Sequence, residues 1–354
     1  MTDEVGEAVR RFREGEIVVV TDDGDRENEG DLVCAASLCT PEKMAFIIRH
    51  CCGIVCTPLT AERARALHLA PMVATNDAPL GTAFTVTVDV AHGLTTGISA
   101  EQRSNTARAL ANPNMGAGDF VRPGHVFPLI ARKGGVLMRS GHTEAAVDLC
   151  ALAGLPEVGV ICELANDDGT VMKGPQIDAF AAAHGLARIS VADLIAWRQA
   201  REHLVERVGE FTAASPIGPL RVIAYATPFD SVRHFAFVHG DPAAVPVVPV
   251  RLHRSDIVGD ILGGAASLNA ALARIREAGA GIVVYLRDGA AGVPLKQEEG
   301  TEQARQKHWL EVGLGAQILR DLGATRIRIL ASRELNYVGL RGFGIEIEAN
   351  EPLG

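Results

Sequence analysis

The sequence has few aromatic residues, no long apolar run and no excess of positive charge. Only 5% of its 354 residues are aromatic, and the formal net charge is −9 at pH 7. Nucleic-acid binding usually needs basic side chains that contact phosphates, or aromatic rings on which bases stack. No stretch reaches the roughly 18 to 20 apolar residues that span a bilayer. We therefore expect neither a nucleic-acid partner nor a membrane segment.

Cysteine is absent from the second half of the chain. The seven cysteines lie between residues 34 and 162, and their spacing indicates neither a disulfide framework nor a zinc finger. The first sixteen residues are charged where a secretory signal has an apolar core. We therefore expect a cytoplasmic protein in which most cysteines are buried thiols.

Length and composition predict two globular domains. The chain is 47% hydrophobic and 22% charged, and 354 residues exceed the size of one ordinary domain. Residues 1–199 hold 17 Lys+Arg against 25 Asp+Glu, whereas residues 200–354 hold 17 against 18. Apolar residues at helical spacing predict an amphipathic helix over 191–208. We place the boundary near Ala200, which gives domains 1–199 and 200–354.

Both halves mix helices and strands. In the first half, the patterns predict helices at 4–14, 41–51, 104–110, 144–153 and 174–184, and strands at 17–23, 84–90 and 159–164. In the second half, they predict helices at 266–277 and 302–322, and strands at 220–227, 234–240, 245–253, 280–287, 325–332 and 343–349.

An acidic loop follows the first strand. Residues 21–31, TDDGDRENEGD, contain six acids and one arginine. A loop of this kind is often a solvated turn, because acidic residues favour turns. It is equally the composition of a site for a hard cation such as Mg²⁺, which prefers oxygen ligands. The arginine within the run favours the second interpretation, because it can hold substrate oxygens beside the metal.

The segment Arg139–Glu144 opens a predicted helix. A helix N-terminus beside an arginine is suited to a phosphate, and His142 in the same turn could bind a metal nearby. The alternative is simple helix capping by Ser140 or Thr143. The sequence leaves both interpretations open.

Two further residues are candidates for acid–base chemistry. His125 lies in a proline-rich turn and Glu163 at the end of a strand, although a single residue in such a place is structural more often than catalytic. Taken together, the four segments supply what proton abstraction beside the carbonyl of a phosphorylated sugar requires.

Long motifs in the first half resemble those of the 3,4-dihydroxy-2-butanone 4-phosphate synthase family. Over residues 4–199 they are, in the family's order, DDGDRENEGDL, RHCCGIVC, GTAFTVTVD, GLTTGISAEQR, RPGHVFPL, RSGHTEAAVDL and CELANDDGT. The resemblance implies an α+β fold, a three-layer α-β-α sandwich with a mixed sheet. It also implies conversion of D-ribulose 5-phosphate to L-3,4-dihydroxy-2-butanone 4-phosphate and formate in riboflavin biosynthesis, by a homodimer that uses Mg²⁺ or Mn²⁺.

The same resemblance assigns roles to individual residues. Glu27 and His142 would hold the metal, and His125 and Glu163 would be catalytic. Three of these residues, Glu27, His142 and Glu163, would also contact the substrate. The other substrate contacts would be Arg26, Asp31, Cys56, Thr96, Arg139, Ser140, Gly141 and Thr143. Thr95, next to Thr96, matches the same segment of the family's pocket. Cys52 departs from the family, in which many members carry a small hydroxyl residue after the Arg-His pair.

The second half resembles a GTP cyclohydrolase II domain, an α/β fold, but departs from it in its chemistry. The family holds a zinc ion with three cysteines, and Asp256, Ser267 and Asn269 stand at or near those places. Asp288-Gly289-Ala290-Ala291 replaces the stretch with the catalytic arginine, and the segment between Lys307 and Gly315 is short. Carboxylate, hydroxyl and amide are weak zinc ligands, so we expect no zinc and no cyclohydrolase activity. The alternatives are a bifunctional enzyme and a non-catalytic sugar-phosphate-binding protein.

Overall fold

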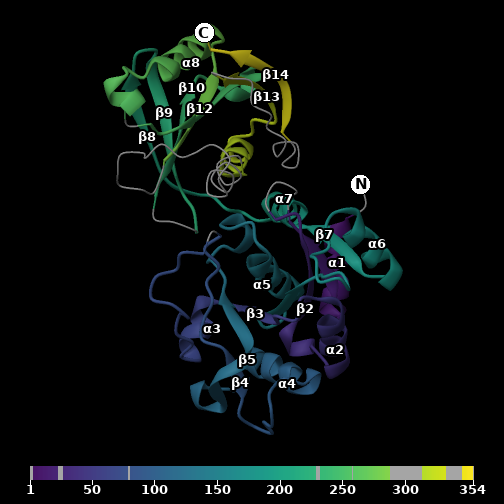
Figure 1. Ribbon diagram of the computed structural model, residues 1–354. Helices are drawn as coiled ribbons and strands as arrows, with labels where there is room; N and C mark the ends of the chain where they lie inside the picture. Colours follow the sequence, from purple (N-terminus) through teal and green to yellow (C-terminus); the bar gives the residue numbers. More distant parts are fainter. Residues whose placement is uncertain are drawn as a thin grey trace. The chain divides into compact units, whose positions relative to one another are not determined.

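The computed structural model describes residues 3–22, 27–78, 80–228, 232–256, 258–287, 313–331 and 345–353. The chain forms two compact units, Met1–Ile195 and Ala196–Gly354, each with its own sheet (Figure 1). Across the described residues, no helix combines the length and the apolar character needed to cross a membrane.

The sheet of the first unit has seven strands in the order β4-β5-β3-β6-β2-β1-β7. It is mixed, because β1 pairs with β7 and β3 with β5 in parallel, whereas the other neighbours are antiparallel. The strands are β1 (Val18–Thr21), β2 (Gly30–Ala35), β3 (Cys56–Leu59), β4 (Val88–Val90), β5 (Phe120–Ile130), β6 (Gly159–Glu163) and β7 (Ala187–Ser190).

Helices cover both faces of this sheet. All residues of β1, β2 and β3 are buried, although their side chains alternate between the two faces, so neither face is open to solvent. Helix α5 packs on β2, β3 and β6 and against α1, whereas α4 packs against α2 and on β4. The helices are α1 (Glu4–Arg13), α2 (Pro41–His50), α3 (Ala61–Ala66), α4 (Ala100–Ala111), α5 (His142–Ala153) and α6 (Pro175–His184). Helix α7 (Val191–Arg201) begins in the first unit and ends in the second.

Local capping explains where several helices begin and end. The Thr40 hydroxyl accepts from the Lys43 N–H, and Pro41 occupies the first turn of α2. Gly154 and Gly185 adopt left-handed backbone angles that close α5 and α6. The predicted helices at 4–14, 41–51, 144–153 and 174–184 therefore agree with the structure within two residues at each end.

Three expectations need correction. Only Val88–Val90 of the predicted strand 84–90 forms β4, whereas Phe84 and Thr85 make isolated bridges to Leu129 and Pro71. Helix α4 is longer than predicted, because the Ser99 hydroxyl caps it at Gln102 N. The helix predicted over 191–208 ends at Arg201, and Val208 belongs to a strand, β8, which the sequence did not reveal because most of its residues are exposed.

The second unit also has a seven-stranded mixed sheet, in the order β14-β13-β11-β12-β10-β9-β8. Helix α8 (Ala266–Glu277) contacts β11 and β12, residues 313–321 are helical, and residues 302–312 of the second predicted helix lie outside the described ranges. The strands are β8 (Glu206–Ser215), β9 (Gly218–Ala226), β10 (His234–His239), β11 (Val248–Arg254), β12 (Gly281–Leu286), β13 (Arg326–Ala331) and β14 (Glu346–Pro352).

Candidate active site

Three parts of the first unit meet at Asp31. Asp31 in β2 and Glu163 in β6 are directly opposite each other on neighbouring antiparallel strands. Asp31 Oδ1 lies 3.5 Å from Nδ1 of His142, the first residue of α5. Burial, followed by the negative charges of Glu163 and Glu27, raises the pKa of Asp31 well above its usual range. The acidic loop, the strand end and the helix start therefore lie close enough to interact through one carboxyl group.

One acid of the loop shapes its backbone. Asp22 accepts hydrogen bonds from the Glu27 N–H at 3.1 Å and the Glu29 N–H at 2.9 Å. Burial, and then repulsion by Glu27, raises the pKa of Glu29. The carboxyl groups of Glu27 and Glu29 thus lie close together on a turn whose backbone N–H groups bind the Asp22 carboxylate. Arg26, predicted as a substrate ligand, lies outside the described residues.

The residues around Asp31 suit a hard divalent cation. Asp31 Oδ1 is buried and, among the described residues, accepts no hydrogen bond. An uncompensated buried oxygen next to two further carboxylates is unfavourable unless a proton or a cation neutralises it. Oxygen ligands with one imidazole match what Mg²⁺ or Mn²⁺ accepts in proteins. The donor set therefore fits the metal that the sequence predicts.

The start of α5 has no side-chain cap. Gly141 is the N-cap residue and no side chain caps the helix, so the capping alternative for Ser140 or Thr143 is wrong. Arg139, which is 6% exposed, donates from Nη1 to Glu144 Oε2 at 2.8 Å. Its Nη2 donates to the Leu80 carbonyl and to Thr82 Oγ1, both at 3.2 Å. The guanidinium is consequently fixed in place beside the helix N-terminus.

His125 is held by a residue that the sequence analysis missed. Asp89 Oδ1 accepts from the His125 backbone N–H at 2.9 Å, and Asp89 Oδ2 lies 2.7 Å from His125 Nδ1. The His125 side chain is 42% exposed, whereas that of Asp89 is 4% exposed. The available signal was one charged residue within the strand pattern FTVTVDV. Asp89 thus orients the His125 ring through Nδ1, and the side chain remains partly exposed to solvent.

A loop lies over this aspartate–histidine pair. Gly97 has φ +82°, and a Cβ there would collide with Asp89 Oδ2 and His125 Nδ1, so only glycine fits. Gln102 accepts from the Gly97 N–H and donates from Nε2 to Thr95 Oγ1 at 2.6 Å. Thr95 and Thr96 are exposed on the same loop. Gln102 therefore links Thr95 to Gly97, which lies against His125.

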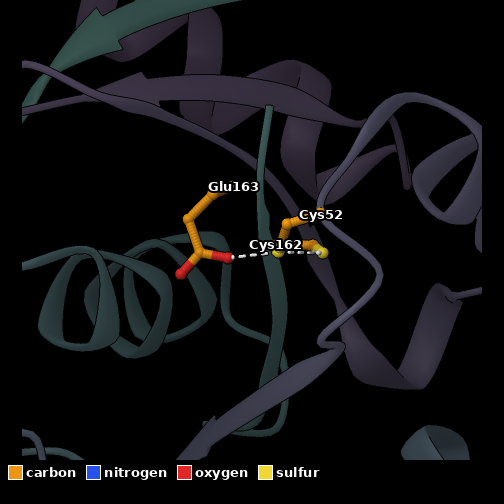
Figure 2. Close-up of side chains that lie close together, drawn as sticks. All are labelled: Cys52, Cys162 and Glu163. Atoms are coloured by element: carbon orange, nitrogen blue, oxygen red, sulfur yellow. Dashed lines mark hydrogen bonds between the residues drawn. The ribbon is translucent and has the colours of Figure 1, made fainter. Parts of the chain in front are cut away.

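Glu163 has two cysteines beside it (Figure 2). The Cys52 thiol donates to Glu163 Oε2 at 2.8 Å, and its Sγ lies 3.7 Å from Cys162 Sγ. Cys56 begins β3, and burial, then the Glu163 and Asp31 charges, raises the pKa of its thiol above the usual range. The surroundings of Cys56 therefore favour the neutral thiol over the thiolate.

These groups make the first unit a catalytic domain for metal-assisted proton transfer on a phosphorylated substrate. Comparison with known proteins agrees with that class. Residues 6–197 match the family model of 3,4-dihydroxy-2-butanone 4-phosphate synthase, and residues 206–352 match that of GTP cyclohydrolase II.

Two relatives from Arabidopsis thaliana span almost all of the chain. The bifunctional riboflavin biosynthesis protein RIBA 1, chloroplastic, is 43% identical over 99% of this chain and 68% of its own length. The monofunctional riboflavin biosynthesis protein RIBA 2, chloroplastic, is 44% identical over 99% of this chain and 76% of its own length.

Solved structures also match either the whole chain or its first part alone. RibBX of A. baumannii, described as a two-domain 3,4-dihydroxy-2-butanone 4-phosphate synthase, is 37% identical, with a TM-score of 0.83 and 99% of both chains covered. A 3,4-dihydroxy-2-butanone 4-phosphate synthase in complex with two magnesium ions is 45% identical, with a TM-score of 0.55 over 56% of this chain and 97% of its own.

The chain belongs to the 3,4-dihydroxy-2-butanone 4-phosphate synthase family and continues into a domain of the GTP cyclohydrolase II family. The predicted fold, two domains with mixed sheets, is confirmed, and so is the predicted function of a synthase in riboflavin biosynthesis.

Proposed function

We propose that Glu27 and His142 hold the Mg²⁺ with which this synthase converts D-ribulose 5-phosphate to L-3,4-dihydroxy-2-butanone 4-phosphate and formate. The observation that carries this assignment is the position of Asp31. Its buried carboxyl group interacts with Glu27 and Glu163 and lies 3.5 Å from the His142 ring. Mn²⁺ accepts the same ligands and would substitute for Mg²⁺.

The substrate phosphate binds at the start of α5. Backbone N–H groups of the first helical turn point toward an anion, and the helix dipole favours it. The segment from Arg139 through Ser140 and Gly141 to Thr143 supplies this position, with the Arg139 guanidinium fixed by Glu144. The sugar hydroxyls then extend toward Asp31, with Cys56 and Thr96 at the edge of the site.

His125 and Glu163 carry the proton transfers. The metal that Glu27 and His142 would hold would make the C–H group beside the substrate carbonyl more acidic. The His125 ring, which Asp89 orients, and the Glu163 carboxylate then accept and return protons during the rearrangement that releases formate. Asp31 keeps the hydroxyl groups in place between them.

The metal assignment is tested with the full chain after chelator treatment. Wild-type protein should regain formate release when Mg²⁺ is added, and Glu27→Gln should need roughly 10 to 100 times more Mg²⁺ for half of its maximal rate. Glu157→Gln, at an exposed position before β6, is the matched control. An unchanged Mg²⁺ requirement in Glu27→Gln would exclude Glu27 as a ligand.

The second unit is proposed to lack GTP cyclohydrolase II activity. Asp256 and Asn269 are exposed, and Asn269 Nδ2 donates to the Gly264 carbonyl at 2.9 Å. With Ser267 as the third group, this set does not fit zinc, which prefers thiolate and imidazole. The residues that replace the arginine-containing stretch, 288–291, lie outside the described ranges.

We also propose that the chain forms a homodimer, as the family resemblance implies. The inactivity of the second unit and the homodimer are tested separately. Incubation with GTP, Mg²⁺ and Zn²⁺ should release no formate, and formate at the rate of a true cyclohydrolase would establish the bifunctional alternative. Light scattering after size-exclusion chromatography should give the mass of a homodimer, and the mass of a single 37.4 kDa chain would contradict it.

A further inference from the structure

The side chains of Cys52, Cys162 and Glu163 form a compact group (Figure 2). One sulfur or oxygen atom from each lies within 4.8 Å of the others. Two sulfurs and one carboxylate differ in chemistry from the oxygen-rich cluster at Asp31.

We propose that Cys52, Cys162 and Glu163 form a second metal site, which binds a borderline or soft divalent cation such as Zn²⁺ or Cd²⁺ and thereby inhibits the synthase. The inhibitory part rests on the proposed role of Glu163, whereas the binding part does not.

The spacing of the sulfurs suits a tetrahedral ion. Zinc–sulfur bonds of about 2.3 Å at a tetrahedral angle place two bound sulfurs about 3.8 Å apart. Cys52 Sγ and Cys162 Sγ are 3.7 Å apart without any ion. The Cys52 Sγ to Glu163 Oε2 distance is 2.8 Å, and the same arithmetic with a zinc–oxygen bond of about 2.1 Å requires about 3.6 Å. The sulfurs can bind almost in place, whereas the carboxylate oxygen must move away from Cys52 Sγ.

The backbone holds the group together. The Cys52 N–H donates to the Glu163 carbonyl at 2.9 Å, and Cys162 and Glu163 are consecutive residues of β6. The next loop residue, Gly53, accepts from Arg103 Nη1 at 3.2 Å, and the Ile54 carbonyl accepts from Cys162 Sγ at 3.3 Å. The loop that carries Cys52 is therefore fixed to the strand at several points, so little ordering is needed when an ion binds.

The position of the group allows an ion to enter and to block the reaction. Cys52 is exposed whereas Cys162 is buried, so one ligand faces solvent and a water molecule can complete the coordination. Mg²⁺ would not compete there, because thiol ligands select softer ions. An ion at this site removes the Glu163 carboxylate from proton transfer.

Binding is tested with Cd²⁺ alone, through the ultraviolet charge-transfer absorption that cadmium–thiolate bonds produce. All seven cysteines lie in the first unit, so the second unit adds no such signal. The full-length protein should show a band that saturates at about one Cd²⁺ per chain. Cys52→Ser, at an exposed position, should lose most of this band, and Cys51→Ser, at the neighbouring position, should retain it. Equal bands in wild type and Cys52→Ser, or no band in the wild type, would overturn the site.

Inhibition is tested separately, with excess Mg²⁺ and ribulose 5-phosphate. Each protein's rate with Zn²⁺ is compared with its own rate without Zn²⁺, and Cys52→Ser should need at least about ten times more Zn²⁺ for half-inhibition. If both proteins are inhibited equally while the Cd²⁺ band still depends on Cys52, the inhibitory role is wrong. A protein without synthase activity would contradict the proposed function and leave the binding result intact.

Discussion

Asp89 contacts both the backbone and the ring of His125, with an oxygen atom for each. This arrangement fixes the direction of the imidazole, because the backbone contact is 2.9 Å and the ring contact 2.7 Å on the same carboxylate. A carboxylate at Nδ1 also favours the tautomer in which Nε2 is available to exchange a proton with substrate. Asp89 is therefore a positioning residue for the proposed acid–base chemistry.

Replacing Asp89 should slow turnover without weakening substrate binding. We expect Asp89→Asn to lower kcat by roughly 10- to 100-fold and to leave KM for ribulose 5-phosphate nearly unchanged, because general acid–base catalysis depends on orientation. Asp178→Asn, which removes an exposed ion pair with Arg188, is the control and should keep the wild-type rate. A rise in KM with unchanged kcat would place Asp89 in binding instead.

The close approach of β4 to β5 depends on Gly124. A Cβ at Gly124 would overlap the backbone of Val88 and Asp89, whereas a Cβ at Gly118 meets nothing within 4 Å. We expect Gly124→Ala to lower the free energy of unfolding by about 1–3 kcal/mol and to reduce activity, because it displaces Asp89 from His125. Gly118→Ala should change neither quantity. Urea unfolding and formate release measure both, and equal stability of the two variants would contradict the geometry.

The buried pair of Arg139 and Glu144 should show strong coupling. Arg139→Ala leaves the Glu144 carboxyl group buried without its partner, which typically costs about 3–5 kcal/mol. The double variant Arg139→Met with Glu144→Leu removes both charges and should be more stable than Arg139→Ala. Urea unfolding at pH 7 tests this order. Additive losses in the double variant would mean that the pair contributes little through its mutual contact.

Acid should destabilise the second unit through Asp260. Burial of Asp260 disfavours its ionised form. Its carboxylate accepts hydrogen bonds from the Tyr285 hydroxyl at 2.7 Å and the Asp256 N–H at 3.1 Å, and lies 2.9 Å from His253 Nε2. These interactions outweigh the effect of burial, so the pKa of Asp260 is lowered. A carboxyl group with a lowered pKa stabilises the fold above its unfolded value of about 3.9, and this stabilisation is lost as the pH falls further.

The test compares wild type with Asp260→Asn in urea at pH 5 and pH 3. The free energy of unfolding of the second unit should fall more in wild type than in the variant over this interval. Identical decreases would show that the ionisation of Asp260 does not contribute.

Local signals predicted most of the helices but not every strand. Thr40-Pro41 and Gly154 are caps that act within a few residues, so α2 and the end of α5 could be predicted from the sequence. Strand β8 has mostly exposed residues and therefore no alternation of apolar side chains, which is the signal that strand prediction needs. Its pairing with β9 supplies the regularity instead.

The candidate site was only partly predictable for a related reason. Motifs named Asp31, His142 and Glu163, but not that Asp31 and Glu163 stand opposite each other, because strand register depends on residues about 130 positions apart. Asp89 was missed because it resembles any polar residue of a strand until its burial is known. The spacing of Cys52 and Cys162 likewise depends on a loop folding back on β6.

The direct opposition of Asp31 and Glu163 makes the chemistry dependent on how two strands are aligned. Because successive side chains point to opposite faces, sliding β6 past β2 by a single position would turn one carboxyl group away from the other while leaving a well-formed sheet. A protein misfolded in this way would have normal secondary structure and no activity, so circular dichroism alone would not distinguish it from the native enzyme.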